Sequence, residues 1–369
     1  MDQPLAGLKV VELARILAGP WAGQLLADLG AEVVKVERPG TGDDTRHWGP
    51  PFGPDGASAY FHSCNRGKRS VAIDLDTPEG QAQIRTVAAD ADVLIENFKV
   101  GRLARYGLDY SSLSALNPRL VYCSITGFGQ TGPYAGRAGY DFVIQAMGGA
   151  MSLTGEPDGE PQKSGIAYAD LFTGLYASVA ILAALRERDR SGRGAHVDMA
   201  LLDSQVAVLA NQALNWMVSG DVPTRMGNGH ANLVPYQAFR VADGEMIVAV
   251  GNDRQFERLC EILGLDGLAR DERFRTNPAR VVNRAALIPL LAQALRGRRR
   301  QELADSLEAA GIPAGPINAV DAVFADPQVV HRGLRIEGRM PGLASPIVID
   351  GKRQVAETPA PRLGEHEPC

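Results

Sequence analysis

The sequence predicts an α/β protein whose larger part is a parallel β-sheet covered by helices on both faces, joined to a smaller α+β part. Three observations carry this prediction. Short apolar runs alternate with helical runs through residues 8–125. A long apolar helical run follows at residues 171–188, and a region with a hairpin pattern begins near Gly227. Strand–helix alternation is typical of parallel sheets, because parallel strands need a crossover connection.

The strands of the first part are short runs rich in Val, Ile and Leu. They are expected at residues 8–13, 31–37, 92–98 and 119–125. Two helices lie between them: one over residues 19–30 that ends in glycine, and one over residues 76–91 with an Asp or Thr cap and Pro78 in its first turn. Ligands of such sheets bind at the carboxyl ends of the strands. We therefore expect the site just after Leu13, Glu37, Phe98 and Ile125.

The second part is expected to begin after a long, mostly buried helix at residues 171–188. The apolar stretch of this helix, residues 171–185, is too short and too mixed in composition to span a bilayer. The expected features beyond it are a hairpin turning at residues 242–244, helical pieces over 255–298, a Pro/Gly turn cluster at 312–318 and an irregular Pro-rich end.

Composition narrows the function classes. Of 369 residues, 45% are hydrophobic and 22% charged, and the net charge is −5. A basic field that would attract nucleic acid is therefore not expected. The four cysteines, Cys64, Cys123, Cys260 and Cys369, are far apart, which indicates reduced thiols of a cytoplasmic protein and neither a zinc site nor a disulfide framework. No metal and no membrane partner are expected.

A G-x-G-x-x-G pattern, Gly127, Gly129 and Gly132, follows the last expected strand. A dinucleotide fingerprint needs its last glycine to open a helix, whose N-terminus holds the pyrophosphate. Gly136 and Gly139 oppose that helix by about 1 kcal/mol each relative to alanine. The pattern therefore predicts a glycine-rich loop where backbone approaches a ligand, and a dehydrogenase is disfavoured.

Several motifs together resemble those of another family. They include LAGPWAGQLLADLGAEVVKVERPGTGDDTR (residues 17–46), NRGKRSVAIDLDTPEG (65–80), ITGFGQTGPYAGRAGYD (125–141) and GRGAHVDMALLDS (192–204). Nearly the whole chain is similar, in order and spacing, to the class III CoA-transferases, the family of formyl-CoA transferase and of the carnitine and bile-acid CoA-transferases. The resemblance implies an enzyme that uses coenzyme A and acyl-CoA as substrates.

The resemblance also implies an architecture. It places a Rossmann-like CoA-binding domain at residues 1–200, completed by 325–369, a linker at 201–226 and a small domain at 227–324. Two chains are expected to form an interlocked homodimer.

The residue of greatest interest is Asp170 in KSGIAYADLFTGLYA. By position alone, an Asp before an apolar helical run is interpreted as a helix N-cap. The resemblance makes it the nucleophile, which forms a mixed anhydride and then an aspartyl-CoA thioester. Both roles are compatible, since a helix N-terminus favours the ionised carboxylate.

The resemblance assigns further residues to the CoA site: Leu17, Ala18, Arg38, Ile73, Asn97, Phe98, Arg105, Tyr140 and Asp141. A guanidinium suits phosphate recognition, which fits the two arginines. Without the resemblance, the arginines are ordinary surface residues, Phe98 is a core residue and Tyr140 and Asp141 are turn residues.

The substrate class is predicted from a subgroup similarity over residues 227–244. This region is most similar to enzymes that use succinyl-CoA and dicarboxylic acceptors such as glutarate, malate, itaconate or mesaconate. A dicarboxylate needs a cation for its distal carboxylate, and Arg15, Arg46 and His47 are candidates. Trp48 is expected to shape the acyl side.

Two further positions come from the same region. Gly229 and His230 align with the family's glycine loop that closes over the intermediate.

Other function classes stay open at this point. The related α-methylacyl-CoA racemases carry a histidine where this chain has Tyr140, so the tyrosine favours a transferase over a racemase or epimerase. Ala138 stands where formyl-CoA transferase has a basic residue, so that contact is not expected here. A non-catalytic CoA-binding protein is the third alternative.

Overall fold

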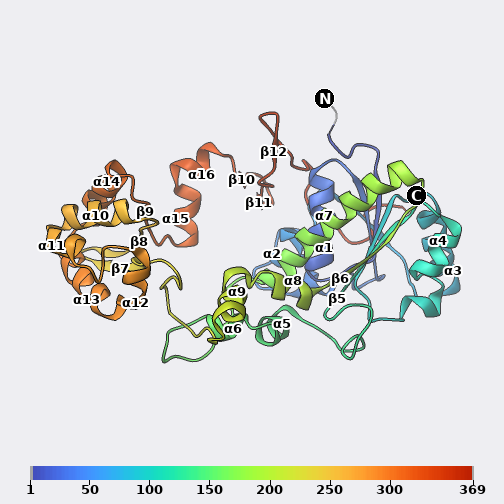
Figure 1. Cartoon of the computed structure of the whole chain (residues 1–369). Coiled ribbons are helices and arrows are strands. Elements are labelled where there is room, and N and C mark those ends of the chain that lie inside the picture. The colour runs from blue at the N-terminus through green and yellow to red at the C-terminus, as the bar shows by residue number, and fades with distance from the viewer. Residues whose placement is uncertain (1–2, 368–369) are drawn as a thin grey trace. The chain divides into compact units, whose positions relative to one another are not determined.

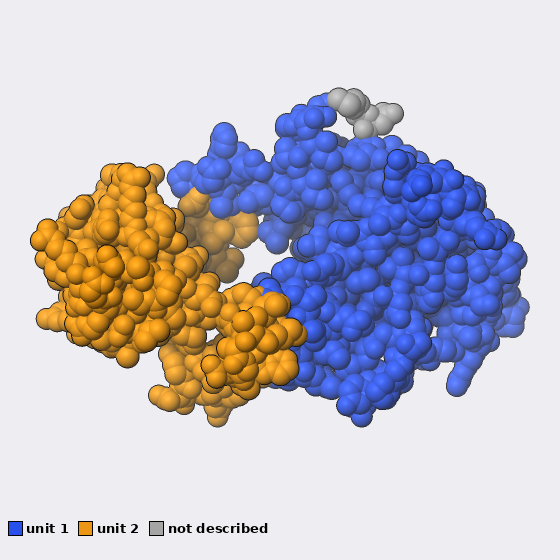
Figure 2. Space-filling model, viewed as in Figure 1, with its two compact units in different colours: residues 1–150, 163–210, 327–369 blue, residues 151–162, 211–326 orange. Residues whose placement is uncertain are grey.

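The structure, a computed structural model, describes residues 3–367 and divides the chain into two compact units (Figure 2). Unit 1 comprises residues 1–150, 163–210 and 327–369, and unit 2 comprises 151–162 and 211–326.

The centre of unit 1 is a six-stranded sheet in the order β3-β2-β1-β4-β5-β6, with all neighbouring strands parallel. The strands are β1 (Lys9–Glu12), β2 (Glu32–Glu37), β3 (Lys68–Ala72), β4 (Val93–Glu96), β5 (Val121–Thr126) and β6 (His196–Ala200). The predicted parallel sheet and its four expected strands are confirmed. The two edge strands, β3 and β6, were not predicted, because their sequences, KRSVA and HVDMA, mix charged and apolar residues.

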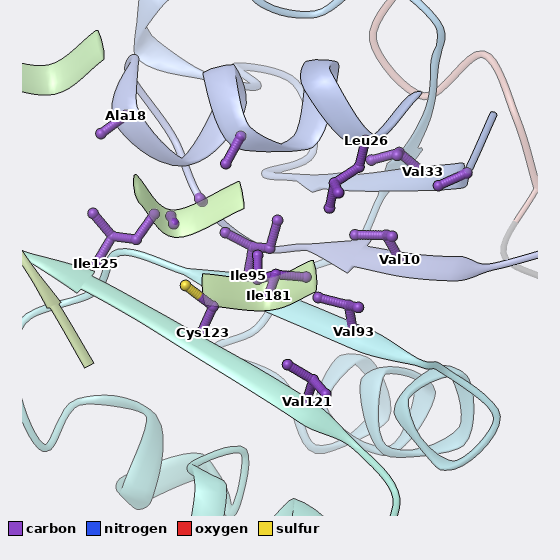
Figure 3. Close-up of a cluster of buried hydrophobic side chains, with 14 of the residues drawn as sticks. Val10, Ala18, Leu26, Val33, Val93, Ile95, Val121, Cys123, Ile125 and Ile181 are labelled. Carbon is purple, nitrogen blue, oxygen red and sulfur yellow. The ribbon is translucent and has the colours of Figure 1, made fainter. Parts of the chain in front are cut away.

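Helices cover both faces of this sheet, as predicted (Figure 1). The longer helices are α1 (Ala18–Asp28), α3 (Pro78–Ala89), α4 (Tyr110–Leu116) and α7 (Tyr168–Ser191). Alternate strand residues face opposite sides: Val10 packs in a core with α1 and α7, and its neighbour Val11 packs in another with α3 and α4. Figure 3 shows the first of these cores, where Leu26 of α1 and Ile181 of α7 meet the sheet valines.

Short elements connect these layers. They are η1 (Asp44–His47), α2 (Ala59–Ser63), η2 (Leu103–Tyr106), α5 (Asp141–Met147), α6 (Ala150–Leu153) and α8 (Leu201–Ala207). The predicted cap of α3 is confirmed as Thr77, whose side chain accepts a hydrogen bond from the Gly80 N–H.

The long helix α7 differs from its prediction in two ways. It is not mostly buried: Phe172, Leu175, Tyr176 and Val179 are exposed on one face. It also extends beyond residues 171–185 at both ends, so that by length and hydropathy it could cross a membrane. A core helix passes the same test, and the buried face of α7 packs on α1 in the core of unit 1.

Unit 2 contains an antiparallel sheet of β7 (Tyr236–Val241), β8 (Gly244–Ala249) and β9 (Ala314–Pro316). The predicted hairpin is confirmed, with its turn at Ala242 and Asp243. Residues 312–318 are not only a turn cluster, because β9 pairs with β8. This is possible because β9 is an edge strand, where the missing N–H of Pro316 costs little.

Five helices pack around a core of unit 2 that includes Phe239, Phe256 and Leu291. They are α10 (Asp253–Leu263), α11 (Asp266–Arg270), α12 (Asn277–Val282), α13 (Arg284–Leu295) and α14 (Arg300–Ala309). Two further helices, α9 (Ala210–Ser219) and α15 (Val320–Ala325), contain no buried residue. Residues 201–226, expected as a linker, thus contain the whole of α8 and α9.

The last segment of the chain belongs to unit 1. It carries α16 (Pro327–His331) and the short strands β10 (Arg335–Ile336), β11 (Gly342–Leu343), β12 (Val348–Ile349) and β13 (Lys352–Arg353). Its end lies along the edge strand β3, where Gly364 N–H donates to Ser70 Oγ and His366 N–H donates to Ser70 O, both at 3.0 Å.

Candidate active site

A pocket of about 230 Å³ lies where the loops after β1, β4 and β5 meet the first turns of α1 and α7. This is the carboxyl edge of the sheet, where the sequence places the site. We call it the Asp170 pocket. It brings together many of the predicted site residues, namely Arg15, Leu17, Ala18, Asn97, Phe98, Tyr140 and Asp170.

Asp170 is the third residue of α7 and not its N-cap, which is Ala167. The cap interpretation is therefore wrong. Capping comes instead from Asp141 at the start of α5, whose Oδ1 accepts hydrogen bonds from the N–H groups of Ala169 (2.9 Å) and Asp170 (3.3 Å). Asp141, predicted as a CoA contact, therefore holds the first turn of α7. Local sequence patterns cannot reveal this contact, because the two segments are far apart in the sequence.

The carboxyl group of Asp170 is buried in the pocket wall, and the residue is only 9% exposed. Burial, together with the smaller effect of the negative charge of Asp141, raises its pKa to about 7. The positive end of α7 acts in the opposite direction. Among residues 3–367, no side chain or backbone group hydrogen bonds to this carboxyl group. The carboxyl oxygens of Asp170 are therefore free to contact a ligand in the pocket.

The start of α1 faces the same pocket through Leu17 and Ala18. No side chain caps this helix. Within the described part of the chain, the backbone N–H groups of Leu17, Ala18 and Gly19 have no hydrogen-bond acceptor. Such open N–H groups at a helix N-terminus favour a negatively charged ligand.

A glycine allows the two helices to approach closely beside the pocket. A Cβ atom at Gly174 of α7 would lie 2.6 Å from the carbonyl oxygen of Ala18 and 3.0 Å from the Trp21 side chain. Gly174 lies one turn after Asp170, on the same face of α7. The crossing therefore fixes Asp170 near the start of α1.

The glycine-rich loop, residues 127–139, forms another wall of the pocket. No helix opens at Gly132; the next helix is α5, at Asp141. A Cβ atom at Gly127 would lie 2.6 Å from the Cα of Gly139, so the two ends of the loop touch backbone to backbone. The absence of a helix at Gly132 agrees with the prediction that this is not a dinucleotide-binding loop, and its approach to a ligand stays a prediction.

A second pocket of about 390 Å³ shares Arg15, Phe98 and Arg102 with the Asp170 pocket. It continues past the ends of β2 and β3, where Arg38 and Ile73 line it. We call it the Arg38 pocket. The guanidinium groups of Arg15 and Arg102 lie 5.9 and 6.0 Å from the centre of the Phe98 ring. The two adjoining pockets thus share two cations; Asp170 lines the first pocket, and Glu37, Asp74 and Asp76 line the second.

Other predicted residues line neither pocket. Arg105 is exposed on η2. Arg46 is buried and makes a bidentate ion pair with Glu37, at 2.8 and 2.7 Å. His47 Nε2 lies 3.1 Å from Thr41 O, and the Trp48 ring packs edge-on against Tyr60. Of the predicted cations for a distal carboxylate, the structure brings only Arg15 to the pocket, where it pairs with Asp44 at 2.8 Å.

Gly229 and His230 belong to unit 2. There the His230 ring is engaged locally, since its Nδ1 accepts hydrogen bonds from the backbone N–H groups of Asn232 and Leu233, at 3.0 and 3.1 Å.

Sequence reasoning missed three cations of the Asp170 pocket: Lys99, Arg102 and Arg137. The guanidinium of Arg137 stacks on Tyr134 at 3.8 Å, and among residues 3–367 it has no carboxylate partner. Its place in the glycine loop was the available signal. Lys99 and Arg102 follow the strand end at Phe98, where a ligand was already expected.

The cysteines of the described residues are all free. Cys64, Cys123 and Cys260 are buried free thiols, while Cys369 lies outside the described residues. Within residues 3–367, no group of three or more His, Cys, Asp or Glu side chains is placed to hold a metal ion.

Comparisons with known proteins agree with this geometry. The model of CoA-transferase family III matches residues 5–367. A succinate–glutarate CoA-transferase of Agrobacterium fabrum is 54% identical over 99% of this chain and 94% of its own length. The human succinyl-CoA:glutarate CoA-transferase is 44% identical over 99% of this chain and 84% of its own length. The crystal structure of a CAIB/BAIF family protein from Brucella suis is 58% identical, with a TM-score of 0.88 over 99% of this chain and 98% of that one.

Proposed function

The chain belongs to CoA-transferase family III and is an enzyme that transfers CoA, and we propose that it moves CoA from succinyl-CoA to a dicarboxylic acid such as glutarate, malate or itaconate. The relatives that support this acceptor class are the glutarate enzymes at 44–54% identity. A succinyl-CoA:mesaconate CoA-transferase of Haloarcula hispanica, 39% identical, supports the broader dicarboxylate class.

One observation carries the proposed mechanism: the pocket holds a buried carboxyl group, that of Asp170, with no hydrogen-bond partner among residues 3–367. A carboxylate kept only to stabilise the fold would be paired or hydrogen bonded, because a buried unpaired charge costs free energy. Its pKa of about 7 leaves a sizeable ionised fraction at neutral pH, and the ionised form is the nucleophile.

The exchange then proceeds in balanced steps. An Asp170 oxygen attacks the thioester carbon of succinyl-CoA, and the C–S bond breaks to release CoA thiolate and leave an aspartyl-succinyl anhydride. The thiolate attacks the aspartyl carbonyl, which releases succinate and leaves an aspartyl-CoA thioester. The acceptor carboxylate attacks this thioester and releases the thiolate again. The thiolate then attacks the acceptor's carbonyl, which yields the new acyl-CoA and restores Asp170. Neither water nor a net proton is consumed.

The open N–H groups at the start of α1 supply what these steps need. Two of the attacks create an oxyanion on the Asp170 carbonyl itself and two on the acyl carbonyl joined to its oxygen, and preorganised N–H donors stabilise such oxyanions. Leu17 and Ala18 line the same pocket as Asp170. We assign the oxyanion to this helix start.

The cations divide between the two ends of the substrate. We propose that the CoA nucleotide lies in the Arg38 pocket, since guanidinium groups suit phosphates. The acceptor's distal carboxylate is assigned to Arg137, which lines the Asp170 pocket without a carboxylate partner in the described residues. Arg15 is less suited to it because Arg15 pairs with Asp44, which it shares with Arg38.

We also propose the homodimer that the resemblance implies. Phe142, Val143 and Met147 of α5 and Phe172 and Tyr176 of α7 are exposed large apolar residues. Apolar surface of this extent favours coverage by a protein partner. A second copy of the chain, interlocked with the first in the cytoplasm, is the proposed arrangement.

Mass spectrometry tests the proposal. The protein is mixed with succinyl-CoA and a pooled panel of carboxylic acids, beside an Asp170→Asn variant of matched size. We expect new acyl-CoA species with the wild type only. Without acceptor, the wild type should carry CoA covalently on the peptide that contains Asp170. Deuterium uptake at Cα of a branched acyl-CoA, with no new thioester, would instead show a racemase.

A further inference from the structure

Ile16, in the loop between β1 and α1, has an unusual backbone conformation. Its φ is +74°, in the left-handed region that side chains with a branched Cβ rarely adopt. Ile16 also lines the Asp170 pocket, immediately before Leu17 and Ala18. Strain of this kind persists only where surrounding groups enforce it, and it is concentrated at functional sites.

The group that enforces it is Asp43. The Ile16 N–H donates to both carboxylate oxygens of Asp43, each at 3.3 Å. The Asp43 side chain is fully buried and forms an ion pair of 2.9 Å with Lys35, whose ammonium also donates to the carbonyl oxygen of Ala14 at 2.9 Å. Lys35 also forms a buried ion pair of 3.0 Å with Glu12, so Ala14 and Ile16 are held by a small buried charge network in which Asp43 contacts Ile16 directly.

The rest of the loop is held in the same way. Asn97, which follows β4, accepts from the Arg15 N–H at 2.9 Å and donates to Arg15 O at 2.6 Å. The Cys64 thiol faces Ile16 O at 3.7 Å. The side chains of four residues, Lys35, Asp43, Cys64 and Asn97, thus contact the backbone polar groups of residues 14–16. The N–H groups of Leu17 and Ala18, which come next, stay open within the described residues.

The buried ion pair between Lys35 and Asp43 has a physical reason other than stability. A buried ion pair is weak evidence for stability, because desolvation of both charges offsets their attraction. Hydrophobic residues of similar volume would fill the space at no greater cost. The pair's specific contribution is to fix the backbone conformation at Ile16, and the peptide that follows inherits that orientation.

We propose that Asp43 is a positioning residue, which holds Ile16 in the left-handed conformation so that the open N–H groups at the start of α1 face the acyl carbonyl on Asp170. This inference rests on the proposed CoA transfer. It assigns no contact between Asp43 and the substrate; Asp43 acts through the Ile16 N–H.

The test compares Asp43→Asn with Asp28→Asn. Asp28 is a matched control, because it is also a buried carboxylate and pairs with Arg66 at 2.6 Å, but it lies at the other end of α1. Both variants should lower the melting temperature. Only Asp43→Asn should lower kcat, by about 100-fold, as expected for displaced transition-state donors. Affinity for CoA itself, measured by calorimetry, should stay near that of the wild type. Equal kcat losses in both variants would overturn the proposal.

A second variant separates positioning from general damage. Glycine adopts a left-handed φ without strain. The loss caused by Asp43→Asn should therefore be smaller by about tenfold when it is measured in an Ile16→Gly background. Full additivity of the two changes would contradict a role through Ile16.

Amide hydrogen exchange gives a readout that does not need activity. Asp43→Asn should speed exchange in the peptide that covers residues 14–18, and Asp28→Asn should not. If the wild type transfers no CoA, the proposed function fails while this comparison still decides the role of Asp43. Unchanged exchange and unchanged kcat in Asp43→Asn, beside an active wild type, would refute the positioning role alone.

Discussion

The two helices that begin at the Asp170 pocket start in opposite ways. The first turn of α7 is closed, because Asp141 accepts from the N–H groups of Ala169 and Asp170. The first turn of α1 is open, with no side-chain cap and with a strained residue before it. The closed start holds a nucleophile in place, and the open start leaves donors for charge that develops during the reaction. The difference indicates that the α7 start positions the nucleophile, whereas the α1 start binds negative charge.

The closest approach of these helices offers the largest expected effect. Gly174→Ala places a Cβ within 2.6 Å of Ala18 O, so α1 and α7 must separate. Alanine improves helix propensity by about 1 kcal/mol, so any loss comes from the crossing. We expect kcat to fall about 100-fold, because Asp170 moves away from the α1 donors. Gly267→Ala in α11 is the control, since a Cβ there meets open space; a similar loss in that control would contradict the explanation.

Arg137, a pocket cation without a carboxylate partner in the described residues, tests the comparison on the acceptor side. Arg137→Ala should raise the KM for a dicarboxylate about tenfold, because a charge-assisted hydrogen bond is lost. A monocarboxylic acceptor should be affected much less. Steady-state kinetics with both acceptors measures the two KM values. Equal changes in the two would show that Arg137 does not bind the distal carboxylate. Arg105→Ala, on exposed η2, provides a comparison outside both pockets.

The carboxylate that closes α7 can be changed without loss of the cap. Asp141→Asn keeps an oxygen that can accept from Ala169 N–H, but it removes a negative charge that raises the pKa of Asp170. The ascending limb of the kcat profile, which we expect near pH 7 in the wild type, should move to lower pH. A limb that stays in place would show that the titrating group is not Asp170.

The smallest expected effect is on stability. The pKa of Asp170 is raised on folding, so its ionisation opposes folding above the unfolded pKa, and the penalty grows until the pH passes about 7. Asp170→Asn should therefore stabilise the protein more at pH 8 than at pH 5. Melting temperatures at the two values measure this. A larger gain at the acidic pH would contradict the raised pKa.

Much of the fold follows from local sequence patterns. Continuous apolar runs predict β1, β2, β4 and β5, and Thr77 and Pro78 predict the start of α3. The strand β3 escapes prediction because its Lys68 is a core residue only through its ion pair of 2.8 Å with Glu12, which lies on another strand. Tertiary pairing thus overrides what the charge indicates locally.

The site divides in the same way. The resemblance and the strand-end rule lead to Leu17, Ala18, Asn97, Phe98 and Asp170, which the structure brings together. The assignment of a distal-carboxylate cation to Arg46 has no support in the geometry, because the guanidinium is bound by Glu37. The contacts of Asp141 with α7 and of Asp43 with Ile16 join segments distant in sequence, and no local spacing encodes them.

The return of the last segment to β3 has a consequence for how the protein is made. Gly364 and His366 bond to Ser70, yet the ribosome synthesises them after all of residues 211–326. The edge of the unit 1 sheet must therefore wait uncovered while the whole of unit 2 emerges. A strand edge exposed in a nascent chain invites wrong pairing. We expect unit 2, whose main segment is continuous, to mature first and unit 1 to close last.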